Sequence, residues 1–150
     1  MPFKFFRRSK TEKKEVNVKK DSLLQLCEKH FPEDPRAMYE ELMRIPVNIP
    51  VGYRQGFEET IRLAEQKEKE GNIEEAAEYL RKAAGLAYKE GTAEDVKKFL
   101  LEREKLLERI PKEKRKGLAS LRYNTILKDT EASWRIMREY LKLSQQSEVS

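Results

Sequence analysis

The sequence holds few of the residues that cross-link a chain or carry it through a membrane. Cys27 is the single cysteine among 150 residues, so an internal disulfide is excluded and a reducing compartment is indicated. No apolar run approaches the length of a membrane span. The basic start MPFKFFRR is followed by SKTEKKEVNVKK, where a secretory signal would have its apolar region. We therefore expect a cytoplasmic protein.

Turn-forming residues are also scarce, with six glycines and six prolines. No stretch of the sequence alternates apolar and polar residues over several positions, and KEVNVKK is its only strand-like piece. Charged residues make up 39% of the chain and apolar residues 38%, a balance that favours long solvated helices over sheet. The expected fold is all-α, a single bundle of about six helices at residues 21–144, with a frayed end at 145–150.

Positive charge is concentrated at the start of the chain. Residues 1–20 hold eight lysines and arginines and two glutamates, a net charge of +6, so the +5 of the whole chain leaves −1 for residues 21–150. A segment with this much charge and few apolar residues cannot offset the entropy of ordering, and we expect residues 1–20 to be a disordered basic tail. Attraction to a polyanion would come from this tail and from local patches.

Local signals place two short helices before a connector. DSLLQLCEKHF is typical of a helix that ends at Pro32, and Asp34 ahead of Pro35 marks the start of a second helix. The prolines of PVNIPVG, residues 46–52, favour extended backbone, so this stretch should cross the surface as a connector.

Three helices are expected between residues 53 and 110. Gly71 can adopt the left-handed conformation that ends the first, and Asn72 can cap the second. The apolar stripe of this second helix, residues 73–90, is rich in alanine, which lets neighbouring helices approach closely. TAED at 92–95 resembles a capping box at the start of the third. We expect the alanine-lined helix to lie in the middle of the bundle.

Beyond Pro111, apolar residues recur at steps of four and three positions from Tyr123 to Leu141. This spacing predicts a long amphipathic C-terminal helix that reaches about Ser144. Gly117 and the stretch KDTE at 128–131 can break it, so two consecutive helices are the alternative.

The segment KEGNIEEAAEYLRKAAGLA, residues 69–87, is typical of one half of a helical hairpin. Small and apolar residues flank its glycine as in a tetratricopeptide-type hairpin, which residues 57–90 resemble. Nothing recurs at the roughly 34-residue period of such arrays, so an array is not expected. With the third helix, residues 53–110 are similar to the three-helix microtubule-interacting-and-transport domains, and this resemblance implies binding of short helical peptides. The residues that carry the hairpin resemblance are Leu63, Ala64, Gly71, Ala76, Leu80 and Ala83.

Cys27 and His30 are the one cysteine and the one histidine, three positions apart on a predicted helix. Such a pair can form half of a metal site or a thiolate with its base, but zinc sites rarely complete their ligands with carboxylates alone. A cysteine between leucines and a phenylalanine is usually a small core residue. Adjacent acids such as Glu40 and Glu41 point about 100° apart on a helix and mark solvated faces. We expect no catalytic residue, no cofactor and no metal.

The N-terminal aromatic residues are the first candidate binding set. Phenylalanine rings can insert at a lipid headgroup boundary while lysine and arginine meet anionic lipid, although so short a stretch attaches only reversibly. The alternative is that the rings fold back onto a groove between helices. The candidate residues are Phe3, Phe5, Phe6, Arg7 and Arg8.

A second basic cluster lies in KEKRKGLASLRY, residues 112–123. Its cations can contact phosphates while a tyrosine ring stacks on a base, or they can form a plain solvated face that pairs with the acidic stretch EKEGNIEE. The candidate nucleic-acid-binding residues are Lys112, Lys114, Arg115, Lys116, Arg122 and Tyr123.

The C-terminal stripe is the third candidate set. Such a stripe is most often core, but it becomes a partner-binding or dimer surface where the helix extends beyond the body, because tryptophan and tyrosine contribute disproportionately to interfaces. The candidate residues are Trp134, Met137, Tyr140 and Leu141.

These features together favour a non-catalytic helical adaptor or accessory subunit that binds another protein or a helical peptide. One alternative is a nucleic-acid-associated accessory factor that contacts DNA or RNA through the basic tail and the 112–122 cluster. A second is a peripheral tether to an anionic membrane surface through FKFFRR. Affinity that falls steeply with ionic strength would distinguish nucleic-acid binding from an apolar protein contact.

Overall fold

The computed structural model describes residues 22–47, 56–114, 117 and 121–149, and within them every regular element is helical. The all-α prediction is therefore confirmed for this part of the chain. No helix in these ranges is both long and apolar enough to cross a membrane. In chain order the elements are a helix at residues 22–30, α2 (Pro35–Met43), α3 (Phe57–Lys69), α4 (Ile73–Glu90), α5 (Ala93–Glu108), a 3-10 turn η2 (Lys112–Lys114), α6 (Asn124–Lys128) and α7 (Thr130–Val149).

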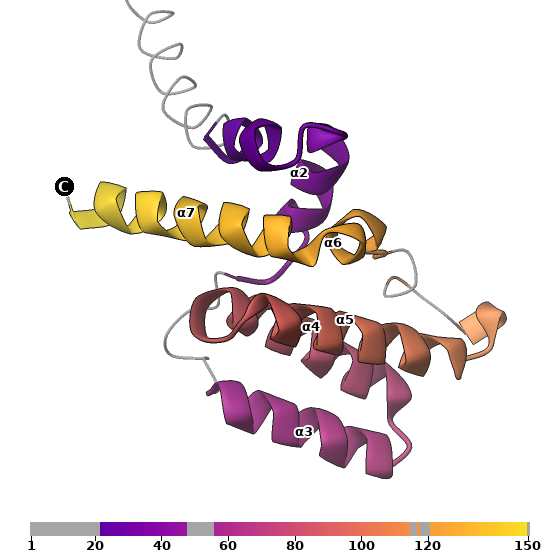
Figure 1. Cartoon of the computed structure of the whole chain (residues 1–150). Coiled ribbons are helices and arrows are strands. Elements are labelled where there is room, and N and C mark those ends of the chain that lie inside the picture. Colours follow the sequence, from indigo (N-terminus) through magenta and orange to yellow (C-terminus); the bar gives the residue numbers. More distant parts are fainter. Residues whose placement is uncertain (1–21, 48–55, 115–116, 118–120, 150) are drawn as a thin grey trace, which may run out of the picture.

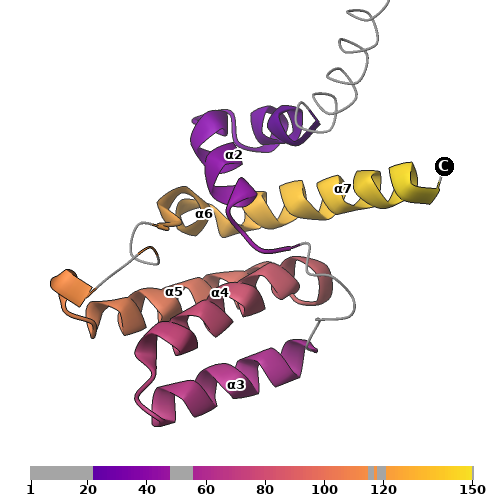
Figure 2. The same cartoon turned by 180° about the vertical axis from the view of Figure 1, so that it is seen from behind.

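The helices stack in layers, which Figures 1 and 2 show from opposite sides. α3 forms one outer layer, α4 and α5 lie side by side in the next, α6 and α7 form a third, and α2 with the helix before it lies beyond them. α4 packs closely against both α3 and α5. The expected central position of the alanine-lined helix is thus confirmed, and its buried alanines are Ala76, Ala77, Ala83, Ala84 and Ala87.

Capping residues set several helix ends as the sequence predicts. Asp34 accepts a backbone N–H at 3.2 Å at the start of α2, and Gly71 ends α3 with a φ of 85°. Thr92 and Asp95 form the reciprocal capping box of α5, at 3.2 and 3.0 Å. Asn72 occupies the N-cap position of α4, but its side chain makes no capping hydrogen bond.

The C-terminal amphipathic segment forms two helices, which was the alternative prediction. The chain breaks within KDTE at Asp129, whose Oδ1 accepts the Ala132 N–H at 3.1 Å and so caps α7. The start of α6 is capped from a distant helix. The Glu41 carboxylate of α2 accepts the N–H groups of Thr125 and Ile126 at 2.9 and 3.0 Å. Glu41 is only 7% exposed, so the expectation that it marks a solvated face is wrong.

Gly85 lets the connector after α2 cross α4 in close contact. A Cβ atom at this position would clash with the carbonyl oxygen of Pro46, so the crossing requires glycine. The crossing adds Ile45 and Val47 to the core. The predicted surface connector is therefore wrong for Val47, while residues 48–52 lie outside the described ranges.

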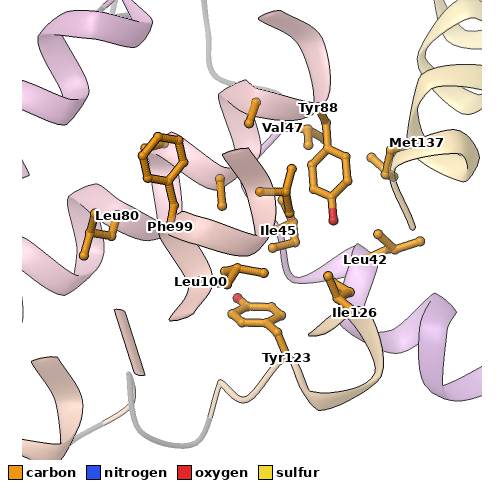
Figure 3. Packing of buried hydrophobic residues seen from close by; sticks show 14 of the residues in the cluster. Leu42, Ile45, Val47, Leu80, Tyr88, Phe99, Leu100, Tyr123, Ile126 and Met137 are labelled. Carbon is orange, nitrogen blue, oxygen red and sulfur yellow. The ribbon is translucent and has the colours of Figure 1, made fainter. Parts of the chain in front are cut away.

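The core is built where α2, the connector, α4, α5, α6 and α7 meet, and Figure 3 shows this packing. Tyr88 of α4 points toward Leu42 of α2 and Met137 of α7. Its hydroxyl lies 3.0 Å from Ser133 Oγ, so the one polar atom of this ring is satisfied inside the core.

α3 is held at the edge of the fold by one face. It buries only Thr60 and Ala64, and the Thr60 hydroxyl donates to the Gly56 carbonyl oxygen. At its first residue, the Phe57 ring makes an edge contact with the Phe99 ring of α5, with centroids 5.7 Å apart. Along the rest of their length α3 and α5 have few contacts with each other, and this separation forms a groove.

Candidate protein-binding groove

The groove lies between α3 and α5, with α4 beneath it. Its volume is about 400 Å³, within the range of sites that take a ligand. Residues spaced three and four positions apart on α3 and α5 face it, because that spacing brings side chains to one face of a helix. The apolar lining residues are Ile61, Ala64, Leu80, Phe99 and Leu106.

The two ends of the groove are closed differently. At one end the Phe57–Phe99 edge contact joins the first turn of α3 to the second turn of α5. At the other end Arg109, the residue that directly follows α5, places its Nη1 atom 3.1 Å from Glu68 Oε1 of α3. Both side chains of this bridge are about half exposed, 55% and 48%, and such surface ion pairs contribute only about 0–1 kcal/mol. The bridge can therefore open at little cost.

The rims of the groove carry opposite charges. The α3 rim presents Glu65 and Glu68, a net charge of −2. The α5 rim presents Lys98, Lys105 and Arg109 with Glu102, a net charge of +2. The Lys98 ammonium lies 6.0 Å from the centroid of the Phe99 ring, so one of these rim charges is close to the apolar floor.

A larger hollow of about 660 Å³ lies between the start of α5 and the junction of α6 with α7. Its polar groups are largely engaged, because Thr92 and Asp129 cap their own helices. The indole nitrogen of Trp134 beside it is buried and has no hydrogen-bond partner in the described part of the chain. The lining of this hollow has charges of both signs and few apolar side chains, so the hollow is a weaker candidate for a binding site than the groove.

The candidate residues of the C-terminal stripe do not form one surface. Met137 is 1% exposed and belongs to the core, so it is not available to a partner. Trp134, Tyr140 and Leu141 are half-buried. The Trp134 ring stacks under Arg138, with the guanidinium carbon 5.3 Å from the ring centroid, and Arg138 donates to the Lys89 carbonyl at 2.7 Å. This part of α7 is thus bound to the end of α4.

In the structure, the tyrosine of the basic cluster at residues 112–123 is not exposed for binding. Tyr123 is fully buried, and the guanidinium carbons of Arg44 and Arg103 lie 5.4 and 5.2 Å from the centroid of its ring. Its hydroxyl donates to the Arg44 carbonyl oxygen at 3.2 Å. The expectation that this ring stacks on a base is therefore wrong. Lys112, Lys114 and Arg122 are exposed, and Arg115 and Lys116 lie outside the described residues.

The arginines around Tyr123 were not predicted from the sequence. Arg103 is fully buried on α5, and burial lowers its pKa. Arg81 of α4 donates to the Arg44 carbonyl at 2.8 Å and pairs with Glu78. The spacing of the sequence does indicate that Arg103 is buried, because position 103 falls on the apolar face of α5 with residues 96, 99, 100 and 107. Cation–π contacts and hydrogen bonds explain this cluster as part of the core.

Among the described residues, Cys27 and His30 do not form a metal site with further ligand side chains. Cys27 is fully buried, and burial, with a smaller contribution from Glu28, raises its pKa to about 12, so the thiol is neutral at physiological pH. His30 Nε2 lies 3.2 Å from Glu139 Oε1 of α7. In the ranges that the structure covers, no three His, Cys, Asp or Glu side chains are grouped to hold a metal.

The N-terminal candidates Phe3, Phe5, Phe6, Arg7 and Arg8 lie outside the described residues. Comparison of the chain with protein-family models, with curated proteins and with solved structures gives no match. The choice of function therefore depends on the geometry of the groove.

Proposed function

We propose that this protein is a non-catalytic helical adaptor, or accessory subunit, that binds a segment of a partner protein in the groove between α3 and α5. The observation that carries the proposal is the groove itself, an apolar floor between two charged rims. This combination is typical of a surface that takes an apolar face and orients it by its charges.

The construction of α3 supports the same function. A helix that buries only two residues contributes little to the core, yet it supplies one whole wall of the groove. Its partner wall, α5, is anchored in the core by Phe99, Leu100 and Arg103. The fold thus combines one wall that is anchored in the core with one outer wall that buries only two residues.

The two alternative functions have less support. Nucleic-acid contact through residues 112–122 lacks an exposed aromatic ring, since Tyr123 is buried. The residues proposed to tether the protein to a membrane lie outside the described ranges. No observation on the described residues favours either alternative over a protein partner.

A pull-down from an extract of the source cells, with and without nuclease, tests the proposal. Ile61→Asp places a charge on the groove wall, and Leu101→Asp makes the same kind of change at a 42% exposed position of α5 that does not line the groove. We expect one or more proteins to be retained by the wild type and by Leu101→Asp but lost from Ile61→Asp, whether or not nuclease is present. Equal recovery by all three proteins would contradict the proposal, and recovery that requires nucleic acid would support the first alternative.

A further inference from the structure

The charges on the two rims of the groove indicate which charges a bound segment should have. The α3 rim has a net charge of −2 and the α5 rim a net charge of +2, so an electric field runs across the groove from α5 to α3. A segment with one sign of charge on both sides would be attracted by one rim and repelled by the other. A segment with a different charge on each side is attracted by both.

The length of the rims limits the size of the occupant. From Lys98 to Arg109 the α5 rim extends about 16 Å, because an α-helix rises 1.5 Å per residue. A helix of about three turns covers this distance, and its apolar residues at every third and fourth position would meet the floor.

The bridge between Glu68 and Arg109 indicates what the occupant must supply at one end. These two side chains span the groove at 3.1 Å and form a direct ion pair between its rims. A helix lying along the whole floor has to separate them. Separation costs little when the helix offers a cation to Glu68 and a carboxylate to Arg109, since each charge then regains a partner.

From these observations, and resting on the proposed function, we propose that the groove binds an amphipathic helix of a partner protein that has one basic edge and one acidic edge. The basic edge lies along α3 and the acidic edge along α5, and the helix takes the place of the Glu68–Arg109 bridge. Turning such a helix end for end would exchange its edges, so the rim charges also set the direction in which it lies.

Three synthetic peptides of about 18 residues, long enough to form a helix, test the proposal. They share one leucine face and differ in their edges: one lysine and one glutamate edge, two lysine edges, or two glutamate edges. Binding to the full-length protein is measured by fluorescence anisotropy at low salt. We expect the mixed-edge peptide to bind at least about tenfold more tightly than either uniform peptide, because each uniform peptide places like charges against one rim.

Charge reversal on one rim provides the matched control. Lys98→Glu with Lys105→Glu makes both rims acidic, and we expect the preference to move to the peptide with two lysine edges. Lys29→Glu with Lys142→Glu changes the net charge equally at exposed positions off the groove, and the ranking should stay as in the wild type. The same ranking in both double variants would overturn the inference.

Other results separate the inference from the proposed function. Equal affinity for the three peptides, abolished by Ile61→Asp, would leave the groove as a binding site but remove its charge selection. Binding that Ile61→Asp does not change would contradict both. If the wild type sediments as a dimer and Ile61→Asp as a monomer, the occupant is a second copy of the chain and the inference fails.

Discussion

Glu41 shows how one carboxylate can join distant parts of a chain. From its place on α2 it accepts the N–H groups of the second and third residues of α6, 84 and 85 positions away. Helices otherwise obtain such caps from a residue at their own start, and here Tyr123 at the N-cap provides no side-chain cap. The buried glutamate therefore holds the N-terminal helices to the C-terminal ones.

Replacing Glu41 by alanine should lower the free energy of unfolding by about 2–3 kcal/mol, because one buried and one partly buried N–H group lose a charged acceptor. The neighbouring Glu40 is exposed, and Glu40→Ala should change stability by no more than about 0.5 kcal/mol. Urea unfolding followed by circular dichroism measures both values. Similar effects of the two substitutions would show that the cap does not stabilise the fold.

Among the helices, α3 buries far fewer residues than α4 and α5. It has two buried residues, whereas α4 has nine and α5 has six. Local opening requires less free energy where few apolar contacts are lost. α3 should therefore exchange its backbone amide hydrogens faster than α4 and α5.

Hydrogen exchange followed by mass spectrometry of the full-length protein tests this expectation. We expect amides of residues 61–69 to be protected at least about tenfold less than those of residues 77–88, and the mixed-edge peptide to slow exchange in α3 more than in α7. Equal protection of α3 and α4 would show that the outer wall of the groove is as firmly attached as the core.

Local signals predicted the elements well and their contacts less well. Asp34 with Pro35, Gly71, and the Thr92–Asp95 box mark helix ends correctly, because each acts on backbone groups within a few positions. Contacts over long separations could not be predicted in this way. The three-helix unit at residues 53–110 was expected, but its groove depends on the spacing between α3 and α5, which no local pattern encodes.

The stability of the whole molecule depends on pH through weak acids that are buried in their neutral form, and Cys27 and Tyr88 are two of them. Burial raises the pKa of Cys27 to about 12 and raises that of Tyr88 as well. In the unfolded chain the Cys27 thiol titrates near its ordinary value of 9.0. Above that pH the unfolded state releases a proton that the folded state keeps, so stability falls as pH rises. Below about pH 8 both states hold the proton and this contribution is constant.

The expected loss from Cys27 is about 1 kcal/mol in the free energy of unfolding between pH 9 and pH 10. Cys27→Ala removes this titration, so its stability should decline less over the same interval, although its value at pH 7 is lower because the core loses a sulfur atom. Urea unfolding at several pH values gives the two slopes, and comparing slopes cancels the constant cost of the cavity. Equal slopes in wild type and variant would mean that the thiol meets solvent in the folded protein, and the tight packing of the helix at residues 22–30 against the core would then be wrong.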